Sequence, residues 1–282
     1  MSKQKIQEIV TQIWIKALEG GEIPWKKTWA NGMPANLSSK KPYRGFNIMT
    51  LALSGHSSKW WGTLKQIKAK KGRVRKEEMG NSTPIIFWRT IEKEDDQGDK
   101  HTYFILRFYK VWNMDQLESP IELGEDETGC DFEPIEACET IVSEYNGPEI
   151  KCGQTFNPCY SPSKDEVLMP EADQFESPEA YYATLFHELG HSTGHEDRLA
   201  REGVTDPIKF GSHNYSQEEL VAEFTAAMLC GETGISPRTI DNQAAYIQSW
   251  LKRLQNDRGL LIRAAGAAQK AADHIKGKEY QK

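Results

Sequence analysis

Residues 177–194 read SPEAYYATLFHELGHSTG, and this stretch contains the pattern His-Glu-x-x-His. Its local signals predict a helix. Ser177 suits the N-cap, Pro178 suits the first helical position, and the charge of Glu179 complements the positive end of the helix dipole. Gly194 is a suitable stop signal. The apolar residues between these ends form no narrow stripe, which indicates a helix buried on most sides.

The two histidines of this stretch are predicted to bind one metal ion. His187 and His191 are four residues apart, so a helix places both rings on one face, one turn apart. Glu188 lies about 100° around the helix, where its carboxylate can contact a metal-bound water without binding the metal. Two surface histidines on an ordinary helix are the alternative, but the capped ends and apolar flanks argue against it. Glu188 is the predicted catalytic residue of a zinc metallopeptidase-like site.

A catalytic zinc usually takes a third protein ligand and keeps one position for water. Residues 216–230 predict a second helix, closed by Gly231, and Glu219 on this helix is the favoured third ligand. Glu223 lies one turn further on the same face, where its carboxylate could hold a ligand histidine from behind.

Other acidic residues remain alternative ligands. Glu218 adjoins Glu219, and Asp197 lies ten residues after His187. Glu219 also has an alternative role, because Ser216 and Glu219 have the Ser-x-x-Glu spacing of a capping box at a helix start.

The overall composition indicates two domains and no membrane segment. The chain has 282 residues, enough for two domains of ordinary size, and 38% hydrophobic residues. No apolar run is long enough to span a bilayer, and the N-terminus lacks the apolar region of a signal peptide. An odd number of cysteines without a Cys-x-x-Cys pair fits reduced thiols, so a cytoplasmic location is expected. These are Cys130, Cys138, Cys152, Cys159 and Cys230.

Charge is divided unevenly along the chain. The net charge of −6 combines a basic first part with an acidic second part. Residues 1–115 contain 21 Lys and Arg against 11 Asp and Glu, whereas residues 116–282 contain 14 against 30. This asymmetry suggests that the first part meets a polyanion.

The first part is predicted to be an α+β domain with a curved or barrel-like antiparallel sheet. Residues 4–19 have the apolar spacing of a helix, and residues 60–72 read as a short basic helix. Residues 84–91 and 102–112 are rich in β-branched and aromatic residues and predict a hairpin.

Tryptophans interleaved with basic residues predict a surface for single-stranded DNA. Seven of the eight tryptophans precede residue 115. Cations follow the phosphates of such a strand while unpaired bases stack on aromatic rings. Trp14, Trp88 and Trp112 are assigned to the core instead. The predicted DNA-binding residues are Trp25, Lys26, Lys27, Trp29, Tyr43, Arg44, Lys65, Lys68, Lys70, Lys71, Arg73 and Arg75.

An acidic stretch with Pro and Gly, residues 116–136, predicts the domain boundary. The expected domains are residues 1–125 and residues 126–282. In the second, residues 134–145 predict a helix, and residues 156–160 and 167–170 predict a hairpin. An edge strand of that hairpin could pair with an extended peptide beside the His-Glu helix. Further helices are expected near 240–255 and 259–275.

Over nearly its full length the sequence resembles the ArdC antirestriction proteins of conjugative plasmids. Four N-terminal segments resemble the single-stranded-DNA-binding domain of that family, and two later segments resemble its zincin-like metallopeptidase domain. The segments are residues 18–29, 41–47, 63–72, 111–116, 182–199 and 218–223.

The resemblance implies an α+β protein with an N-terminal single-stranded-DNA-binding domain and a C-terminal zincin-like domain. It implies protection of incoming plasmid DNA from host restriction endonucleases, and a metal site of two histidines and an acidic residue. The expected metal is Zn²⁺, with Mn²⁺ as an alternative divalent ion. One alternative function is a DNA-targeted metalloprotease that cleaves a restriction endonuclease or another DNA-bound protein. Another is a pseudo-peptidase whose metal is structural.

Overall fold

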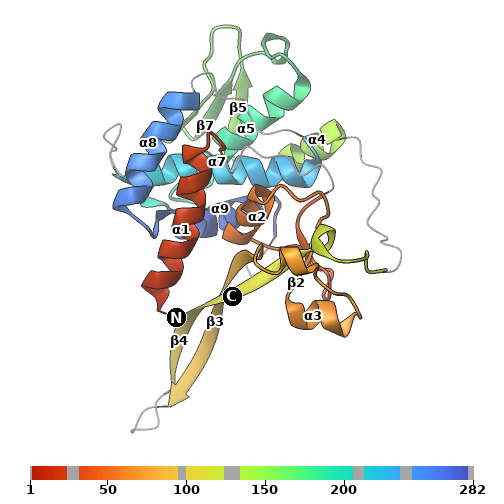
Figure 1. Ribbon diagram of the computed structural model, residues 1–282. Helices are drawn as coiled ribbons and strands as arrows, with labels where there is room; N and C mark the ends of the chain where they lie inside the picture. Colours follow the sequence, from red (N-terminus) through yellow and green to blue (C-terminus); the bar gives the residue numbers. More distant parts are fainter. Residues whose placement is uncertain are drawn as a thin grey trace.

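The computed structural model has a helical body from which one long hairpin projects (Figure 1). Among the described residues, no helix is both long enough and apolar enough to cross a membrane. The structure describes residues 2–23, 32–94, 100–123, 134–205, 213–235 and 243–278, with side chains omitted at 88–94, 100–104, 134, 213–216 and 243–247.

The N-terminal part is a four-stranded sheet with three helices. The strand order is β1-β2-β4-β3, in which β1 and β2 are parallel and the other pairs antiparallel. The helices are α1 (Lys3–Glu19), α2 (Phe46–Leu53) and α3 (Leu64–Ala69), and the strands are β1 (Ala35–Asn36), β2 (Trp60–Gly62), β3 (Thr83–Glu94) and β4 (Lys100–Asn113).

The predicted hairpin is confirmed as β3 and β4, but the prediction of one helix over residues 60–72 is wrong. Trp61 and Gly62 pair with β4 as part of β2. Thr63 then begins α3 with a capping box, because its hydroxyl accepts the Gln66 N–H and the Gln66 side chain accepts the Thr63 N–H. Strand β2 ends at Gly62, and the capping box begins α3 only after Thr63.

The C-terminal part places a small sheet beside a group of helices. The predicted hairpin is confirmed as β6 and β7, whereas β5 was not predicted; β7 lies between β5 and β6. The elements are α4 (Pro134–Glu144), β5 (Glu149–Cys152), β6 (Cys159–Ser161), β7 (Glu166–Met169), α5 (Pro178–Ser192), α6 (Glu202–Thr205), α7 (His213–Thr233), α8 (Gln243–Asn256) and α9 (Leu260–Ile275). Short 3-10 turns cover Lys76–Glu78, Met114–Gln116 and Ala172–Gln174.

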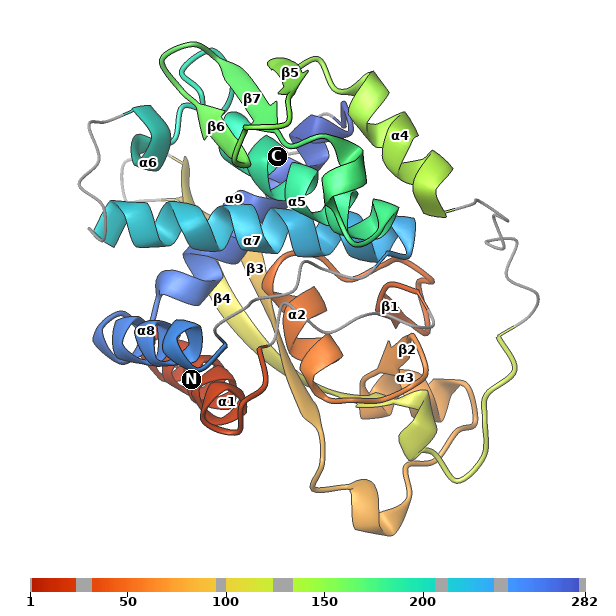
Figure 2. The ribbon, with the colours of Figure 1, turned by 90° about the horizontal axis from the view of Figure 1, so that it is seen from above.

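Helix α7 is the centre of the body, between α5 and α9 (Figure 2). Its residues 220–222 and 224–230 are buried, and α5 crosses it closely. Gly190 makes this crossing possible, because a Cβ at that position would lie only 3.1 Å from the Ala222 Cα. A Cβ at 190 would require the neighbouring atoms of α7 to move by a few tenths of an ångström, so glycine suits this close approach of the two helices that carry the predicted metal ligands.

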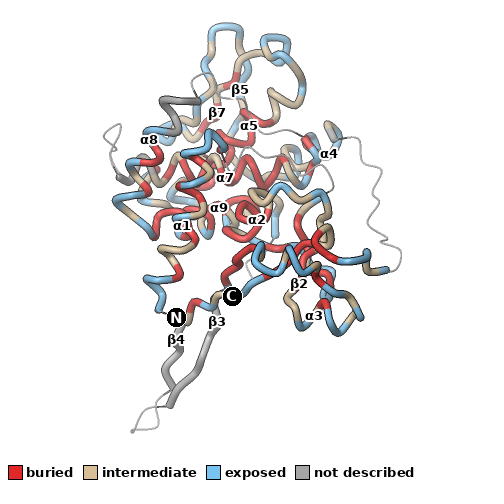
Figure 3. The backbone as a smooth tube through the Cα atoms, in the orientation of Figure 1, coloured by how far each residue is buried: buried red, intermediate tan, exposed pale blue. Residues whose placement is uncertain are grey.

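One apolar core runs through both parts of the chain, and the buried segments in Figure 3 are continuous across them. Trp14 of α1 is 0% exposed; its ring stacks on Phe46 at 5.4 Å between centroids and meets Phe224 of α7 edge-on at 5.5 Å. An ion pair between Arg44 and Asp273 of α9 also joins the two parts. The N-terminal sheet and the helical body are therefore held together by buried contacts.

Replacing Trp14 with alanine should destabilise the whole protein. Loss of a large buried aromatic ring typically costs about 3–5 kcal/mol, and both parts should unfold in one transition because they share this core. Urea unfolding followed by far-UV circular dichroism measures the change. Met79→Ala, at an exposed position, should change stability by less than about 0.5 kcal/mol. A small effect at Trp14, or two separate transitions, would contradict a shared core.

Candidate metal centre

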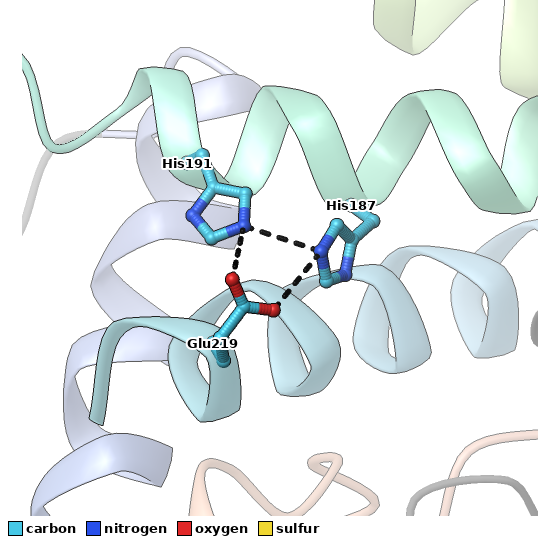
Figure 4. Close-up of side chains that lie close together, drawn as sticks. All are labelled: His187, His191 and Glu219. Atoms are coloured by element: carbon cyan, nitrogen blue, oxygen red, sulfur yellow. Dashed lines mark hydrogen bonds and ion pairs between the residues drawn. The ribbon is translucent and has the colours of Figure 1, made fainter. Parts of the chain in front are cut away.

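Helix α5 carries both histidines of the candidate metal centre. It begins as predicted, because the Ser177 hydroxyl accepts the Ala180 N–H at 3.2 Å and Pro178 occupies the first turn. His187 and His191 then project from the same face, with their Nε2 atoms 3.2 Å apart. Both side chains face α7 (Figure 4).

Glu219 of α7 completes a group of three ligand atoms. One carboxylate oxygen lies 3.7 Å from the His187 Nε2, and the other lies 3.7 Å from the His191 Nε2 (Figure 4). The three ligand atoms all lie within 4.8 Å of one another. Two imidazole nitrogens and one carboxylate oxygen at this spacing fit a single divalent cation of the zinc type.

The structure does not support the capping-box role for Glu219. Helix α7 begins at His213, so Ser216 lies inside the helix rather than at its N-cap. The Glu219 carboxylate is instead directed at the two histidines. Glu223 lies one turn further along α7 and is not part of the three-ligand group. Asp197 is 83% exposed and lies beside His195 at 3.5 Å, away from the group.

Glu218 holds His191 from behind. The His191 Nδ1 lies 3.3 Å from the Glu218 Oε1, and Glu218 is 5% exposed. A proton on Nδ1 leaves the lone pair of Nε2 directed toward His187 and Glu219. Glu218 thus contacts a ligand histidine in the way that was predicted for Glu223.

Arg201 anchors Glu218, a role that no pattern in the sequence indicated. Its guanidinium donates to the two Glu218 oxygens at 2.8 Å and 2.6 Å. It also donates to the Gly190 carbonyl at 2.8 Å and to the Thr193 hydroxyl at 2.6 Å. Arg201 therefore ties the end of α5 to α7 at the level of the metal ligands.

This network changes the pKa of both partners. Burial alone would lower the pKa of His191, but its hydrogen bond to Glu218 and the charges of Glu219, Glu218 and Glu188 raise it to about 9. Burial alone would raise the pKa of Glu218, but its hydrogen bonds from Arg201 and His191 lower it to about 2. Glu218 is therefore ionised throughout the neutral range.

Metal affinity should fall as the pH falls below about 9. The raised pKa of His191 means that a proton must leave this ring before its nitrogen can bind a metal. For that proton, each unit of pH below about 9 should weaken binding by up to about tenfold. Competition with a chromophoric chelator, at pH values from about 6 to about 9, measures the metal affinity over the range in which the histidines titrate. Titrations of the chelator alone with the metal serve as controls. A pH-independent affinity would contradict the His191 assignment.

Glu188 lies at a cavity of about 390 Å³ that the metal ligands also line. Its side chain is buried, and its Oε2 accepts the backbone N–H of Tyr160 at 2.9 Å. Strand β6 therefore orients the carboxylate next to the metal ligands. This is the arrangement needed for a group that receives a proton from a reacting water.

The outer edge of β6 has few free backbone N–H groups that an added peptide strand could bind. Strand β6 pairs with β7 on one side, and on its other side the Tyr160 N–H is already donated to Glu188. Pro158 and Pro162, two residues before and after Tyr160, have no N–H. The expected pairing of this edge with an extended peptide is therefore not supported, because such a peptide would find carbonyls but no N–H at these three residues.

The hydroxyl of Tyr160 is held away from this edge. It donates to Asp165 at 2.7 Å and accepts from Arg198 at 3.1 Å, while Arg198 also donates to the Ser192 carbonyl at 2.7 Å. These bonds fasten the β6–β7 turn to the end of α5, so the wall of the cavity and the histidine helix form one unit.

Three of the predicted DNA-binding residues make contacts within the protein itself. Tyr43 is 5% exposed, and Arg44 is engaged with Asp273. Arg75 donates to the Leu117 carbonyl at 2.9 Å and lies near Glu77.

The remaining candidates form a basic surface or lie outside the described residues. Lys65 and Lys68 of α3 are exposed, as are Lys71 and Arg73 after it, while Lys70 is half-buried. Trp25, Lys26, Lys27 and Trp29 lie outside the described residues, as does the side chain of Trp88. Trp14 and Trp112 are buried, as predicted.

Comparisons with known proteins match both parts of the chain. Residues 3–112 match the N-terminal domain of the anti-restriction factor ArdC, and residues 136–267 match a zincin-like metallopeptidase family. Two DNA primases TraC from Escherichia coli are 36% and 34% identical over 97% of this chain, which spans only 27% and 20% of their length. The uncharacterized protein y4eC of Sinorhizobium fredii (strain NBRC 101917 / NGR234) is 33% identical over 95% of this chain and 90% of its own.

Solved structures give the same result. The metal-free crystal structure of the antirestriction ArdC protein from plasmid R388 has a TM-score of 0.77 and 34% identity, covering 97% of this chain and 99% of the other. Its Mn(II)-bound structure has a TM-score of 0.75 and 34% identity, covering 96% and 97%.

Fold, site and comparisons together define an α+β protein in which an antirestriction-type N-terminal domain is joined to a zincin-like metallopeptidase domain. A zincin-like domain implies a divalent metal, and His187, His191 and Glu219 are a group of side chains that could hold one. The chain belongs to the ArdC antirestriction family.

Proposed function

We propose that this protein binds single-stranded DNA in the cytoplasm and protects incoming plasmid DNA from host restriction endonucleases. The observation that carries the proposal is the likeness to the antirestriction ArdC protein of plasmid R388 over 99% of that chain. In this proposal residues 1–125 form the DNA-binding domain and residues 126–282 the metallopeptidase-like domain.

The charge distribution supports a nucleic-acid partner for the first domain. Residues 1–115 contain ten more basic than acidic residues, 21 against 11. Exposed cations gather on and after α3, at Lys65, Lys68, Lys71 and Arg73. Such a surface attracts phosphates and makes binding sensitive to salt.

We propose zinc as the metal, held by His187, His191 and Glu219, with manganese as the alternative. Bound zinc would supply a Lewis acid that brings the pKa of water to about 7. Glu188 would receive and hold a proton at the cavity, oriented by the Tyr160 N–H. Glu218 and Arg201 would keep the His191 ring in position.

A second candidate is a DNA-targeted metalloprotease, and the position of Glu188 favours it. The carboxylate adjoins the metal ligands in the same cavity, as hydrolysis requires. The proline-flanked edge of β6 argues against an ordinary extended peptide substrate. Antirestriction by DNA binding is therefore the favoured function.

Plasmid transfer into restricting and non-restricting recipient strains tests the proposed function. With the protein present, transfer into the restricting strain should rise, while transfer into the non-restricting strain should not change. A fluorescent single-stranded oligonucleotide, titrated with the full-length protein at about 50 and 200 mM salt, should bind more weakly at the higher concentration. Absence of binding at low salt, or equal transfer with and without the protein, would contradict the proposal.

A further inference from the structure

Two exposed aromatic rings lie together on the β3–β4 hairpin. Phe87 of β3 is opposite Arg107 of β4, and Ile85 is opposite Tyr109. Because side chains alternate between the two faces of a sheet, Phe87, Arg107 and Tyr109 share one face. The Phe87 and Tyr109 rings are 5.9 Å apart between centroids, at an angle of 71°. We call these three residues the hairpin face.

Their exposure is unusual for this protein. Phe87 and Tyr109 are each 45% exposed, and with Met79 they are the exposed large hydrophobic residues of the described part of the chain. The opposite face of the hairpin carries Ile86 and Leu106, which are buried in the core. Ile85 and Val111, on the same face as the rings, are also buried, so both faces of the hairpin pack against the core near the body. The Phe87 and Tyr109 rings nevertheless stay exposed, so core packing does not account for them.

The backbone beneath the hairpin face is held firmly. Asn47 of α2 donates to the Ile86 carbonyl at 2.8 Å and accepts the Ile86 N–H at 2.8 Å. Phe87 lies 6.5 Å from the buried Tyr43 ring, and the Tyr43 hydroxyl accepts from Asn36 at 3.1 Å. The backbone that carries the rings is therefore fixed before any ligand arrives, which lowers the entropic cost of binding.

The charge around the rings is basic. Arg107, on the hairpin face, is exposed, and Lys110 of β4 is exposed on the opposite face. Residues 83–87 and 105–113, which form the described base of the hairpin, contain no Asp or Glu. Aromatic rings accompanied by cations, without acidic residues between them, suit a ligand that has flat apolar groups along an anionic backbone.

We propose that the hairpin face is a stacking platform for unpaired bases of single-stranded DNA, with Arg107 beside the phosphate backbone. This assignment rests on the proposed function and adds the place where the bases bind. Phe87 and Tyr109 offer their rings to any base, so the platform has little sequence preference. Paired bases keep their faces stacked on one another, so duplex DNA does not bind in this way.

Binding by full-length variants tests the platform. Phe87→Ala and Tyr109→Ala should each weaken binding of a fluorescent oligothymidine strand by roughly 5- to 100-fold, the range for loss of one stacked base. Phe87→Trp should retain the affinity, because it keeps an aromatic face. Met79→Ala removes an equally exposed apolar side chain elsewhere and should have no effect. Thermal unfolding of each variant confirms that the fold is retained.

Two further measurements separate the ring contacts from the charge contact. Arg107→Ala should reduce the slope of log affinity against log salt by about 0.7, the contribution of one single-strand phosphate, whereas Phe87→Ala should leave this slope unchanged. A strand containing 5-bromodeoxyuridine should, on irradiation, crosslink to peptides that contain Phe87 or Tyr109.

The outcomes distinguish this inference from the proposed function. If the wild-type protein binds the strand but the alanine variants bind equally well and crosslinks map elsewhere, the platform is wrong and the proposed function stands. If the wild-type protein binds no strand at low salt, both are wrong. Binding of a duplex as tightly as a single strand would also overturn the platform.

Discussion

Replacing Glu219 with alanine should weaken zinc binding by more than the 10- to 100-fold that loss of an outer contact typically costs. The change removes the one carboxylate among the three ligand groups, leaving the two imidazoles. Isothermal titration calorimetry with zinc, and separately with manganese, measures the effect. The fold should be retained, because Glu219 is only half-buried.

Glu223→Ala is the matched control, one turn along the same helix. It should alter zinc affinity little, since Glu223 is not in the three-ligand group. If Glu223→Ala abolished binding while Glu219→Ala left it intact, the ligand assignment would be wrong.

Glu188→Gln should reduce any peptide hydrolysis by about 10²- to 10⁴-fold, the usual contribution of a general base. Glutamine keeps an oxygen that can accept the Tyr160 N–H, so the side chain should remain oriented, but it cannot take up a proton. Zinc affinity and binding of single-stranded DNA should be unchanged. Cleavage of a quenched fluorescent peptide library measures the hydrolytic activity.

The same variant separates the two candidate functions. Under the proposed function, Glu188→Gln should protect plasmid DNA in a restricting recipient as well as the wild-type protein. If protection disappears while zinc and DNA binding persist, hydrolysis is required and the metalloprotease function replaces the proposed one.

Local sequence signals were sufficient for the long elements of the fold. Helix α5 could be predicted because Ser177 and Pro178 define its start. The β3–β4 hairpin could be predicted because both strands are long and rich in β-branched and aromatic residues. The two-residue β1 and the four-residue β5 have too few residues to show an alternation and were not predicted, whereas the equally short β6 and β7 were predicted only together, as a hairpin.

The site was only partly predictable for a related reason. His187 and His191 follow from spacing within one helix. The choice among Glu218, Glu219 and Glu223 depends on how α7 is rotated against α5, which a single sequence does not reveal. Arg201 contacts Glu218 although 17 residues separate them in the sequence, so local spacing gives no indication of the contact.

The DNA-binding candidates illustrate a further limit. Basic and aromatic residues near position 43 read as a binding segment, but tertiary contacts bury Tyr43 and engage Arg44 with Asp273 of α9. The partner lies more than 200 residues away in the sequence, so composition alone could not have revealed it. In contrast, Phe87 and Tyr109 read as ordinary strand residues, and only the sheet register shows that their rings emerge together.

The Trp14 contact between Phe46 and Phe224 has a consequence for how such genes recombine. A crossover between the two parts would leave each resulting protein with a large exposed apolar surface and no matching partner to bury it. Recombination that transfers both parts together should therefore be favoured over recombination that separates them. The TraC primases fit this expectation, because a much longer polypeptide there matches 97% of the present chain rather than one part of it.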